Sequence, residues 1–142
     1  MRLLRAPLVN VPRVKKPRRP IAKVSKKMAA KKQARAKCLD DFFERYGWTG
    51  IEDSEAECQL CGFVVSRSSC DFSHKHRASQ AGPDTPQNGL ALHRLCHTYL
   101  HTRRDLENIC TDSPANLENG LMVKLPDQLR LDLYRYLGLS HL

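Results

Sequence analysis

Residues 58–101 read CQLCGFVVSRSSCDFSHKHRASQAGPDTPQNGLALHRLCHTYLH, and a pair of metal-binding residues stands near each end of this stretch. Cys58 and Cys61 are separated by two residues, as are His93 and Cys96. A pair with this spacing sits on a tight turn and aims two donor atoms at one point, and a structural zinc takes four such donors in a tetrahedron. We therefore predict a structural zinc bound by these four residues.

Three further cysteines, Cys38, Cys70 and Cys110, have no metal-ligand spacing. We expect them to be buried or free thiols in a reducing cytoplasm, although Cys70 or Cys110 is an alternative to His93 as the fourth zinc ligand. The apolar start of the chain is broken at Arg5, so no secretory signal is expected. No apolar run approaches the length of a membrane span, and we predict a cytoplasmic protein without membrane contact.

The chain of 142 residues has room for one small domain with tails, and its charge is distributed unevenly. Residues 1–37 hold 14 of the 24 basic residues and no acidic one, which leaves 10 basic against 15 acidic residues in the remainder. A basic segment attached to a mildly acidic body suits a nucleic-acid partner, because each neutralised phosphate releases counterions. A merely solvated tail and a mitochondrial transit peptide are the alternatives for this segment.

Composition divides the chain into four parts. Residues 1–23, rich in proline and basic residues, should be a disordered arm. Residues 24–47 should form a helix that is basic in its first half and amphipathic in its second, ending at Gly47. Residues 48–110 should form the zinc-stapled domain, and residues 111–142 should form a C-terminal loop and an amphipathic helix over 126–137.

Within the central part, hydrophobic patterning predicts a short α+β unit. Residues 49–57 indicate an acidic loop, and residues 63–65 and 70–72 indicate two strands of an antiparallel hairpin. Proline and glycine mark 80–87 as a loop, and apolar spacing favours one helix over 95–109. Hairpin, loop and helix together give a ββα arrangement.

A second set of polar residues lies between and beside the zinc ligands: His74, Asn88, His97 and His101. The order, residue types and most spacings of residues 55–105 resemble the HNH, or ββα-metal (His-Me finger), endonucleases. Similarity to phage-encoded members is close around 71–74 and 96–101. The family commonly has four cysteines at its zinc, so His93 is a departure, but zinc accepts such Cys3His sets.

The resemblance implies a role for each of these residues. His74 would be the general base that takes a proton from water, since an imidazole can be neutral near pH 7. Asn88 would form hydrogen bonds across the loop and fix the orientation of His74. His97 and His101, one helical turn apart, would share a divalent metal ion such as Mg, Mn, Ni or Zn.

One position departs from the family pattern. The residue before the base is usually Asp or His and binds the catalytic metal, whereas this chain has Ser73. The third metal ligand is therefore open among Ser73, Asp71 and His76, with a water as a further possibility.

Basic residues near this set and on the preceding helix are candidates for contacts to DNA phosphates. They are Arg77, Arg94, Arg103, Arg104, Lys26, Lys27, Lys31 and Lys32.

The sequence thus predicts a small zinc-stapled α+β domain of ββα-metal type with flanking helices and a basic N-terminal arm. The resemblance implies a metal-dependent HNH endonuclease that hydrolyses DNA phosphodiester bonds, encoded by a phage or mobile element and acting in the bacterial cytoplasm. The alternative is a non-catalytic zinc-finger DNA-binding protein in which Ser73 marks a decayed site. Nothing in the sequence indicates an oligomeric state.

Overall fold

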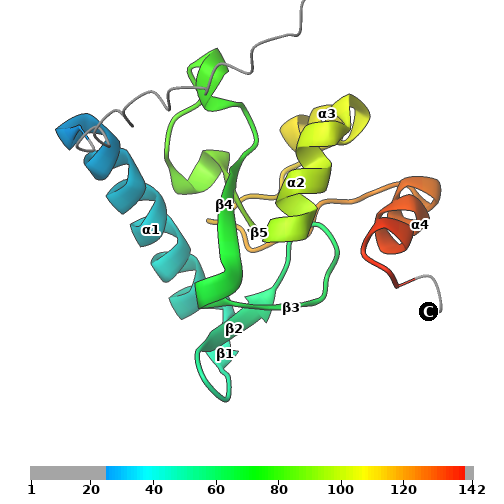
Figure 1. Cartoon of the computed structure of the whole chain (residues 1–142), viewed down its shortest axis with the longest axis horizontal. Coiled ribbons are helices and arrows are strands. Elements are labelled where there is room, and N and C mark those ends of the chain that lie inside the picture. The colour runs from blue at the N-terminus through cyan, green and yellow to red at the C-terminus, as the bar shows by residue number, and fades with distance from the viewer. Residues whose placement is uncertain (1–24, 140–142) are drawn as a thin grey trace, which may run out of the picture.

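The computed structural model describes residues 25–139, and the predicted basic arm at 1–23 lies outside them. The described residues form a small α+β fold with four α-helices and two small sheets, which confirms the predicted fold class. Figure 1 shows its elements: α1 (Lys26–Tyr46), β1 (Trp48–Thr49), β2 (Ser54–Glu57), β3 (Val64–Ser66), η1 (Arg67–Ser69), β4 (Cys70–His74), η2 (Ala78–Gln80), η3 (Pro86–Asn88), β5 (Gly89–His93), α2 (Arg94–Thr102), α3 (Arg104–Asp112) and α4 (Asp127–Tyr136).

The strands pair differently from the prediction. The segment predicted as an acidic loop overlaps β1 and contains β2, which pair with each other, so that prediction is wrong. Strand β3 adds to β2 with Ala56 opposite Val65. The predicted hairpin between β3 and β4 is wrong, because the turn η1 separates these strands into different sheets. The actual partner of β4 is β5, a strand that the sequence pattern did not predict. Its apolar residues are buried, and so short an apolar run has no periodicity that distinguishes strand from helix.

The β4–β5 hairpin lies between α1 on one side and α2 on the other (Figure 1). Its register places Cys70 opposite His93 and His74 opposite Gly89, so the long loop of residues 75–88 joins the two strands at one end. Helix α2 begins directly after β5. The ββα arrangement is therefore present, but it is built from β4, β5 and α2.

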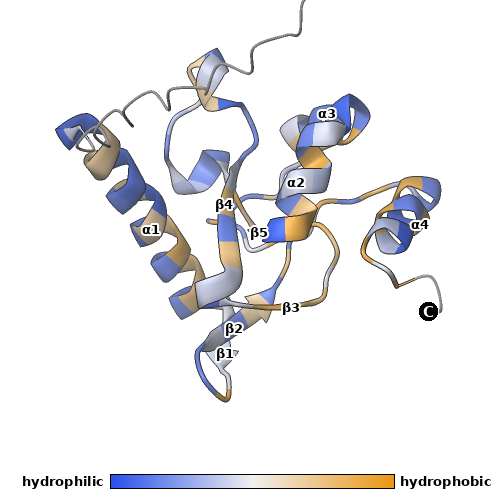
Figure 2. Cartoon of the chain, viewed as in Figure 1, coloured by the Kyte–Doolittle hydropathy of each residue, from blue (hydrophilic) through white to orange (hydrophobic). Residues whose placement is uncertain are grey.

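Helix α1 follows its prediction closely. Ser25 caps its start by accepting a hydrogen bond from the Met28 amide at 3.3 Å, and the helix ends at Tyr46 before Gly47. Hydrophobic residues on its second half face the sheet, whereas its first half is mostly hydrophilic (Figure 2). Leu39, Phe42 and Phe43 are buried as predicted, but Tyr46 is exposed.

The helix predicted over 95–109 is two helices, α2 and α3, which break at Arg103. Arg103 has an extended backbone with φ −126° and ψ 104°. Its guanidinium donates to the Asp105 carboxylate at 2.7 Å and to the Tyr99 hydroxyl at 2.9 Å, so its side chain links the two helices. Apolar periodicity continues across the break because Leu100 and Leu106 both enter the core.

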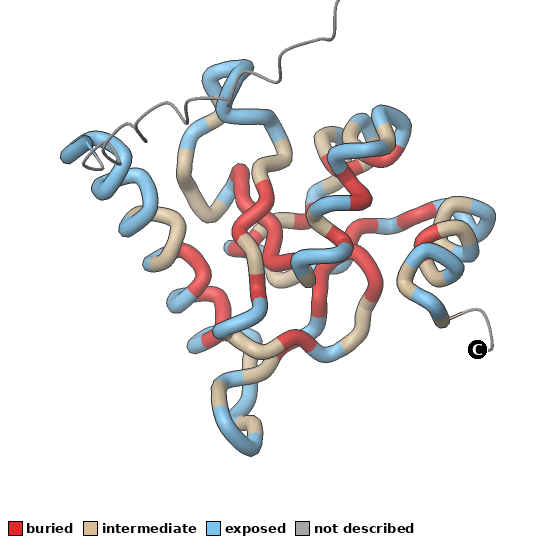
Figure 3. Tube along the Cα trace, in the orientation of Figure 1, coloured by how far each residue is buried: buried red, intermediate tan, exposed pale blue. Residues whose placement is uncertain are grey.

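Buried residues concentrate where the hairpin meets α1, α2 and the C-terminal segment (Figure 3). In α4 the predicted apolar side is only partly buried: Leu133 is fully buried, Leu129 and Leu137 pack at the margin, and Tyr136 is exposed. The Tyr136 ring stacks on Tyr99 with centroids 4.5 Å apart. None of the helices within 25–139 is long and apolar enough to cross a membrane.

Candidate functional site

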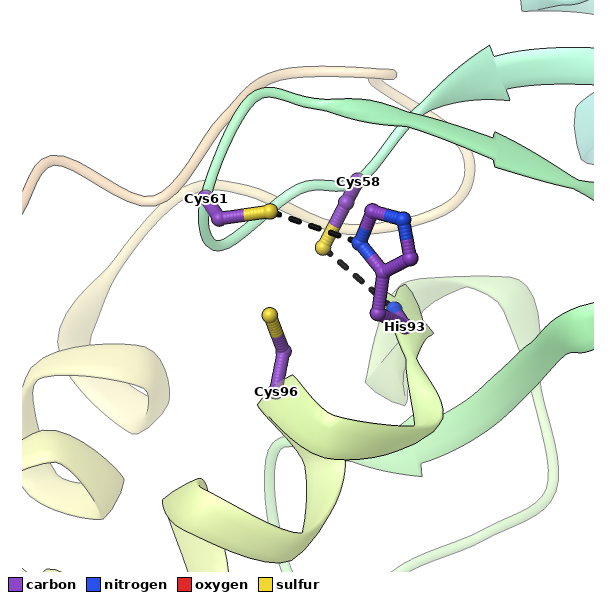
Figure 4. A group of neighbouring side chains, drawn as sticks. All are labelled: Cys58, Cys61, His93 and Cys96. Atoms are coloured by element: carbon purple, nitrogen blue, oxygen red, sulfur yellow. Dashed lines mark hydrogen bonds between the residues drawn. The ribbon is translucent and has the colours of Figure 1, made fainter. Parts of the chain in front are cut away.

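Cys58, Cys61, His93 and Cys96 come together at one point, as the spacing predicts. Their four ligand atoms all lie within 4.8 Å of one another, and the side chains converge on a common space (Figure 4). Ligand atoms of a tetrahedral zinc site with sulfur at 2.3 Å are about 3.8 Å apart, so a small closure of this cluster would seat the ion. The cluster can hold a zinc ion, and it joins the turn after β2 to the start of α2.

Contacts around the cluster orient its ligands. The His93 Nε2 lies 2.9 Å from the Val64 carbonyl oxygen, to which it donates, and this leaves Nδ1 facing Cys61 Sγ at 3.4 Å. Gly62 has φ 79°, a left-handed conformation that favours glycine. It lets the turn of residues 58–62 close, with the Gly62 amide donating to the Cys58 carbonyl at 2.9 Å. Hydrogen bonds with Cys58 and Cys61 raise the pKa of His93 to about 10. A proton thus occupies the position that a bound metal would take, and binding would release it.

The thiol pKa differs between Cys58 of the cluster and the buried cysteines outside it. Hydrogen bonds from Cys61 and Cys96 lower the pKa of the Cys58 thiol far below its ordinary value, which favours the metal-binding thiolate. Burial raises the pKa of both Cys70 and Cys110 to about 12, so these remain neutral thiols. Neither belongs to the cluster, so the geometry favours His93 over Cys70 or Cys110 as the fourth ligand.

A second arrangement lies on α2, where His97 and His101 project from one face. Their Nε2 atoms are 2.9 Å apart, and each Nδ1 faces a carboxylate: Asp71 at 3.3 Å behind His97 and Glu107 at 3.4 Å behind His101. When each Nδ1 carries the proton that faces its carboxylate, both Nε2 atoms present lone pairs to the same point. Without an ion, one ring can instead donate from its Nε2 to the other at this distance, and a cation held between the rings would take the place of that proton. Burial lowers the pKa of His97, which keeps that ring neutral despite Asp71.

His74 and Asn88 lie at the two ends of the loop that joins β4 to β5. The Asn88 side chain is buried; its amide nitrogen donates to the carbonyls of His76 at 3.0 Å and Pro83 at 2.9 Å, and its oxygen accepts from the His76 amide. Asn88 therefore holds both halves of the loop, as predicted, although it bonds to backbone rather than to the His74 ring. The His74 Nε2 faces the Asp84 carboxylate at 2.7 Å.

The same loop closes through a tight backbone contact at Gly82. A Cβ built there would lie 1.8 Å from the His76 carbonyl oxygen, so no other residue fits without moving the chain. His74 and His101 line one cleft of about 360 Å³ between this loop and helices α2 and α3. A substrate entering this cleft meets both imidazoles.

The family model described as HNH endonuclease matches residues 58–103. These residues belong to the HNH endonuclease family. The matched range begins at the first cysteine of the cluster and includes His74, Asn88 and both histidines of α2. No curated protein and no solved structure gives a significant match to the chain.

In this HNH domain the three candidates for a third metal ligand lie in different surroundings. The hydroxyl of Ser73 is fully buried and has no hydrogen-bond partner among the residues that the structure describes. Asp71 faces the Nδ1 of His97, on the ring edge away from His101. His76 is exposed. This geometry favours Asp71 as a residue that orients His97.

Three of the four arginines predicted to contact DNA take part in ion pairs. Arg77 pairs with Glu107, Arg94 with Asp71 and Arg103 with Asp105, whereas Arg104 is exposed and forms no ion pair within residues 25–139. The lysines of α1 are exposed. A groove between α1 and the hairpin is lined by Lys31, Lys32, Arg35, Arg67 and His97, among others.

Two residues of this site were missed in the sequence. Asp84 lies in a loop of proline and glycine, where an acidic residue signals only a turn. Glu107 reaches His101 because the chain breaks at Arg103, and a continuous helix would have given it a different direction. Both contacts depend on tertiary structure that no local pattern encodes.

Proposed function

We propose that the chain is a metal-dependent HNH endonuclease that hydrolyses DNA phosphodiester bonds. The observation that supports this most strongly is the pair of imidazoles on α2, which present two Nε2 atoms 2.9 Å apart with a carboxylate behind each ring. Donors about 3 Å apart are spaced for adjacent positions on one ion with metal–nitrogen distances near 2.1 Å. Carboxylate–histidine pairs of this kind hold metal ligands in a fixed orientation.

In this proposal His97 and His101 hold a divalent cation such as Mg, Mn, Ni or Zn. When bound, the ion supplies a positive charge that stabilises the phosphate in the transition state. His74 acts as the general base: with Nε2 donating to Asp84, its Nδ1 is left to accept a proton from water. Asn88 keeps the loop closed around this base.

The cluster of Cys58, Cys61, His93 and Cys96 takes a structural zinc in the same proposal. Zinc suits it because thiolate and imidazole are the ligands that this ion prefers, and because all four donors come from the protein, which leaves no open position for a substrate. The two metal sites share α2: Cys96 and His97 are neighbours. Seating the zinc thus also places the first turn of the catalytic helix.

Ser73 offers a test of the third ligand. Ser73→Asp should tighten binding of Mn at least about tenfold, because it adds a charged oxygen where relatives of the family carry a metal ligand. Without metal the same variant should be destabilised, since a buried carboxylate lacks a partner. Titration calorimetry and thermal melts with and without Mn measure both effects, with Ser73→Ala as the matched control. Unchanged affinity in Ser73→Asp would place this side chain outside the metal's coordination sphere.

The substrate-binding surface in this proposal is the groove beside α1. Lys31, Lys32 and Arg35 line it together with His97, so a phosphate chain lying there would pass next to the proposed catalytic metal. Lys26 and Lys27 extend the same helix toward its N-terminus. Contacts of this kind recognise the DNA backbone and carry no sequence information.

Removing two of these charges should change the salt dependence of DNA binding. Lys31→Ala with Lys32→Ala should lower the slope of log Kd against log salt by about 2, since each neutralised phosphate contributes about 0.9. Fluorescence anisotropy with a short duplex at several salt concentrations measures this slope. Lys124→Ala, an exposed lysine outside the groove, is the control. A double variant with the wild-type slope would remove this groove from the DNA path.

Supercoiled plasmid offers a direct test of the activity. The full chain, supplied in turn with Mg, Mn, Ni and Zn, should convert it to nicked or linear forms. A protein that binds plasmid but cuts none with any of these ions would instead be the DNA-binding zinc protein of the alternative hypothesis. Phage or mobile-element origin and action in a bacterial cytoplasm stay predictions of the resemblance.

A further inference from the structure

A carboxylate of the β4–β5 loop stands between the proposed base and helix α1. The Asp84 Oδ1 lies 2.7 Å from the His74 Nε2 and 2.6 Å from the Arg35 Nε. The side chains of His74 and Asp84 are each only 14% exposed. Hydrogen bonds between a carboxylate and charged or polar partners in such partly buried surroundings are short and directional.

The loop is itself held so that Asp84 cannot easily leave this position. The Asn88 amide donates to the carbonyl of Pro83, the residue before Asp84, and the Gly82 amide donates to the Arg77 carbonyl at 3.0 Å. Burial alone would raise the pKa of Asp84, but hydrogen bonds from Arg35 and His74 hold it below its ordinary value. The carboxylate is thus charged and can only accept hydrogen bonds.

We infer that Asp84 is the positioning residue of this site: it fixes His74 as the tautomer with its proton on Nε2, and it transmits to His74 the ordering effect of Asn88. An acceptor-only carboxylate at Nε2 requires a donor there, which leaves the Nδ1 lone pair as the basic atom. Asn88 acts on the backbone at Pro83, and Asp84 is the next residue, so the chain of contacts runs from Asn88 through Asp84 to the ring. This inference rests on the proposed function, because it assigns His74 its basic atom.

Arg35 makes the consequence of a substitution specific. Its guanidinium and the His74 Nε2 contact the same oxygen of Asp84, Oδ1. In Asp84→Asn the guanidinium can only donate, so the amide oxygen should take this shared position and His74 should keep its acceptor at Nε2. Asp84→Ala removes the acceptor. The nearby Arg35 cation then favours a lone pair at Nε2, which moves the ring proton to Nδ1 and removes the basic atom.

The test combines catalysis with a spectroscopic reading of the ring. Asp84→Ala should lower kcat for plasmid cleavage about 100-fold, the scale of losing a general base, with little change in KM. Nitrogen NMR of full-length protein labelled in histidine, assigned with His74→Gln, should show His74 protonated at Nε2 in wild type and at Nδ1 in Asp84→Ala. Asp84→Asn, which keeps an oxygen at the position shared with Arg35, should retain the wild-type tautomer and most of kcat. Asp132→Asn, which removes a carboxylate paired with Arg135 on α4, is the matched control and should change neither reading.

The charged and titratable groups near His74 remain unchanged in these variants. They are Lys75, Arg77, His97, His101, Arg104 and Glu107. If wild type cuts DNA but Asp84→Ala keeps both its kcat and its tautomer, the inference fails while the proposed function stands. If wild type cuts no DNA, the proposed function fails, and the tautomer of His74 then decides the inference: a ring protonated at Nδ1 in Asp84→Ala supports it, and a ring still protonated at Nε2 overturns it.

Discussion

Removing zinc from the purified chain should unfold the domain. A structural zinc bound by thiolates contributes about 10 kcal/mol or more to folding, whereas a small domain is stable by only about 5–15 kcal/mol in total. Here the donors lie within 4.8 Å of one another and three of the four are buried, so the empty cluster would leave polar sulfurs crowded in the core. We expect a strong chelator to abolish the cooperative thermal transition monitored by circular dichroism.

Mutation of the cluster provides the controls for this experiment. Cys58→Ser with Cys96→Ser should lose both the metal, by elemental analysis, and the folded state. Cys110→Ser changes a buried cysteine outside the cluster and should keep about one zinc per chain. A double variant that melts like wild type, or a purified wild type without zinc, would contradict the assignment.

The group of four potential metal ligands was predictable from sequence because its geometry is local. Two residues between Cys58 and Cys61 define a turn, and the same spacing at His93 and Cys96 defines a second, so only the meeting of the two turns had to be supplied by the fold. The choice of His93 over Cys70 and Cys110 needed the structure. All three are metal-binding residue types, but Cys70 in β4 and Cys110 in α3 are not part of the group of four converging donors, and spacing does not reveal this.

Strand pairing was less predictable for a physical reason. Residues 63–65 and 70–72 are close in sequence and apolar, which favours a hairpin, but pairing partners depend on long-range contacts that a local pattern cannot weigh. Strand β2 contains two glutamates in four residues, and its pairing with β3 outweighs that weak propensity. A ββα unit is nevertheless present, because proline, glycine and apolar spacing placed the loop after β4 and the start of the following helix; its second strand, β5, was not predicted.

The carboxylates of the histidine site show the same limit. Asp84 reaches His74 from ten positions away, and Glu107 reaches His101 only because α2 ends and α3 begins between them. Neither spacing corresponds to a regular element, so no periodicity marks these residues. The sequence showed the set of histidines. The fold adds a carboxylate beside each ring, and that acceptor favours a proton on the nitrogen it faces and a lone pair on the other nitrogen.

Replacing His74 by alanine should abolish DNA cleavage and leave binding intact. Loss of a general base lowers the rate by about 100- to 10,000-fold, and His74 is the imidazole in the 360 Å³ cleft that lies outside both proposed metal sites. The variant should therefore keep its zinc, its thermal transition and its affinity for duplex DNA. Plasmid cleavage at saturating DNA, followed over hours, measures kcat directly.

The companion variant for this experiment is His97→Ala, which removes a proposed ligand instead of the base. It should also lose cleavage, but excess metal should restore part of the activity, because His101 and the carboxylate behind it remain. Excess metal cannot restore His74→Ala, since no other group in its place accepts the proton from water. The two variants thus separate loss of the base from loss of the ion. Equal cleavage by His74→Ala and wild type would show that the imidazole has no part in the chemistry, and the enzyme assignment would then give way to a zinc protein that only binds DNA.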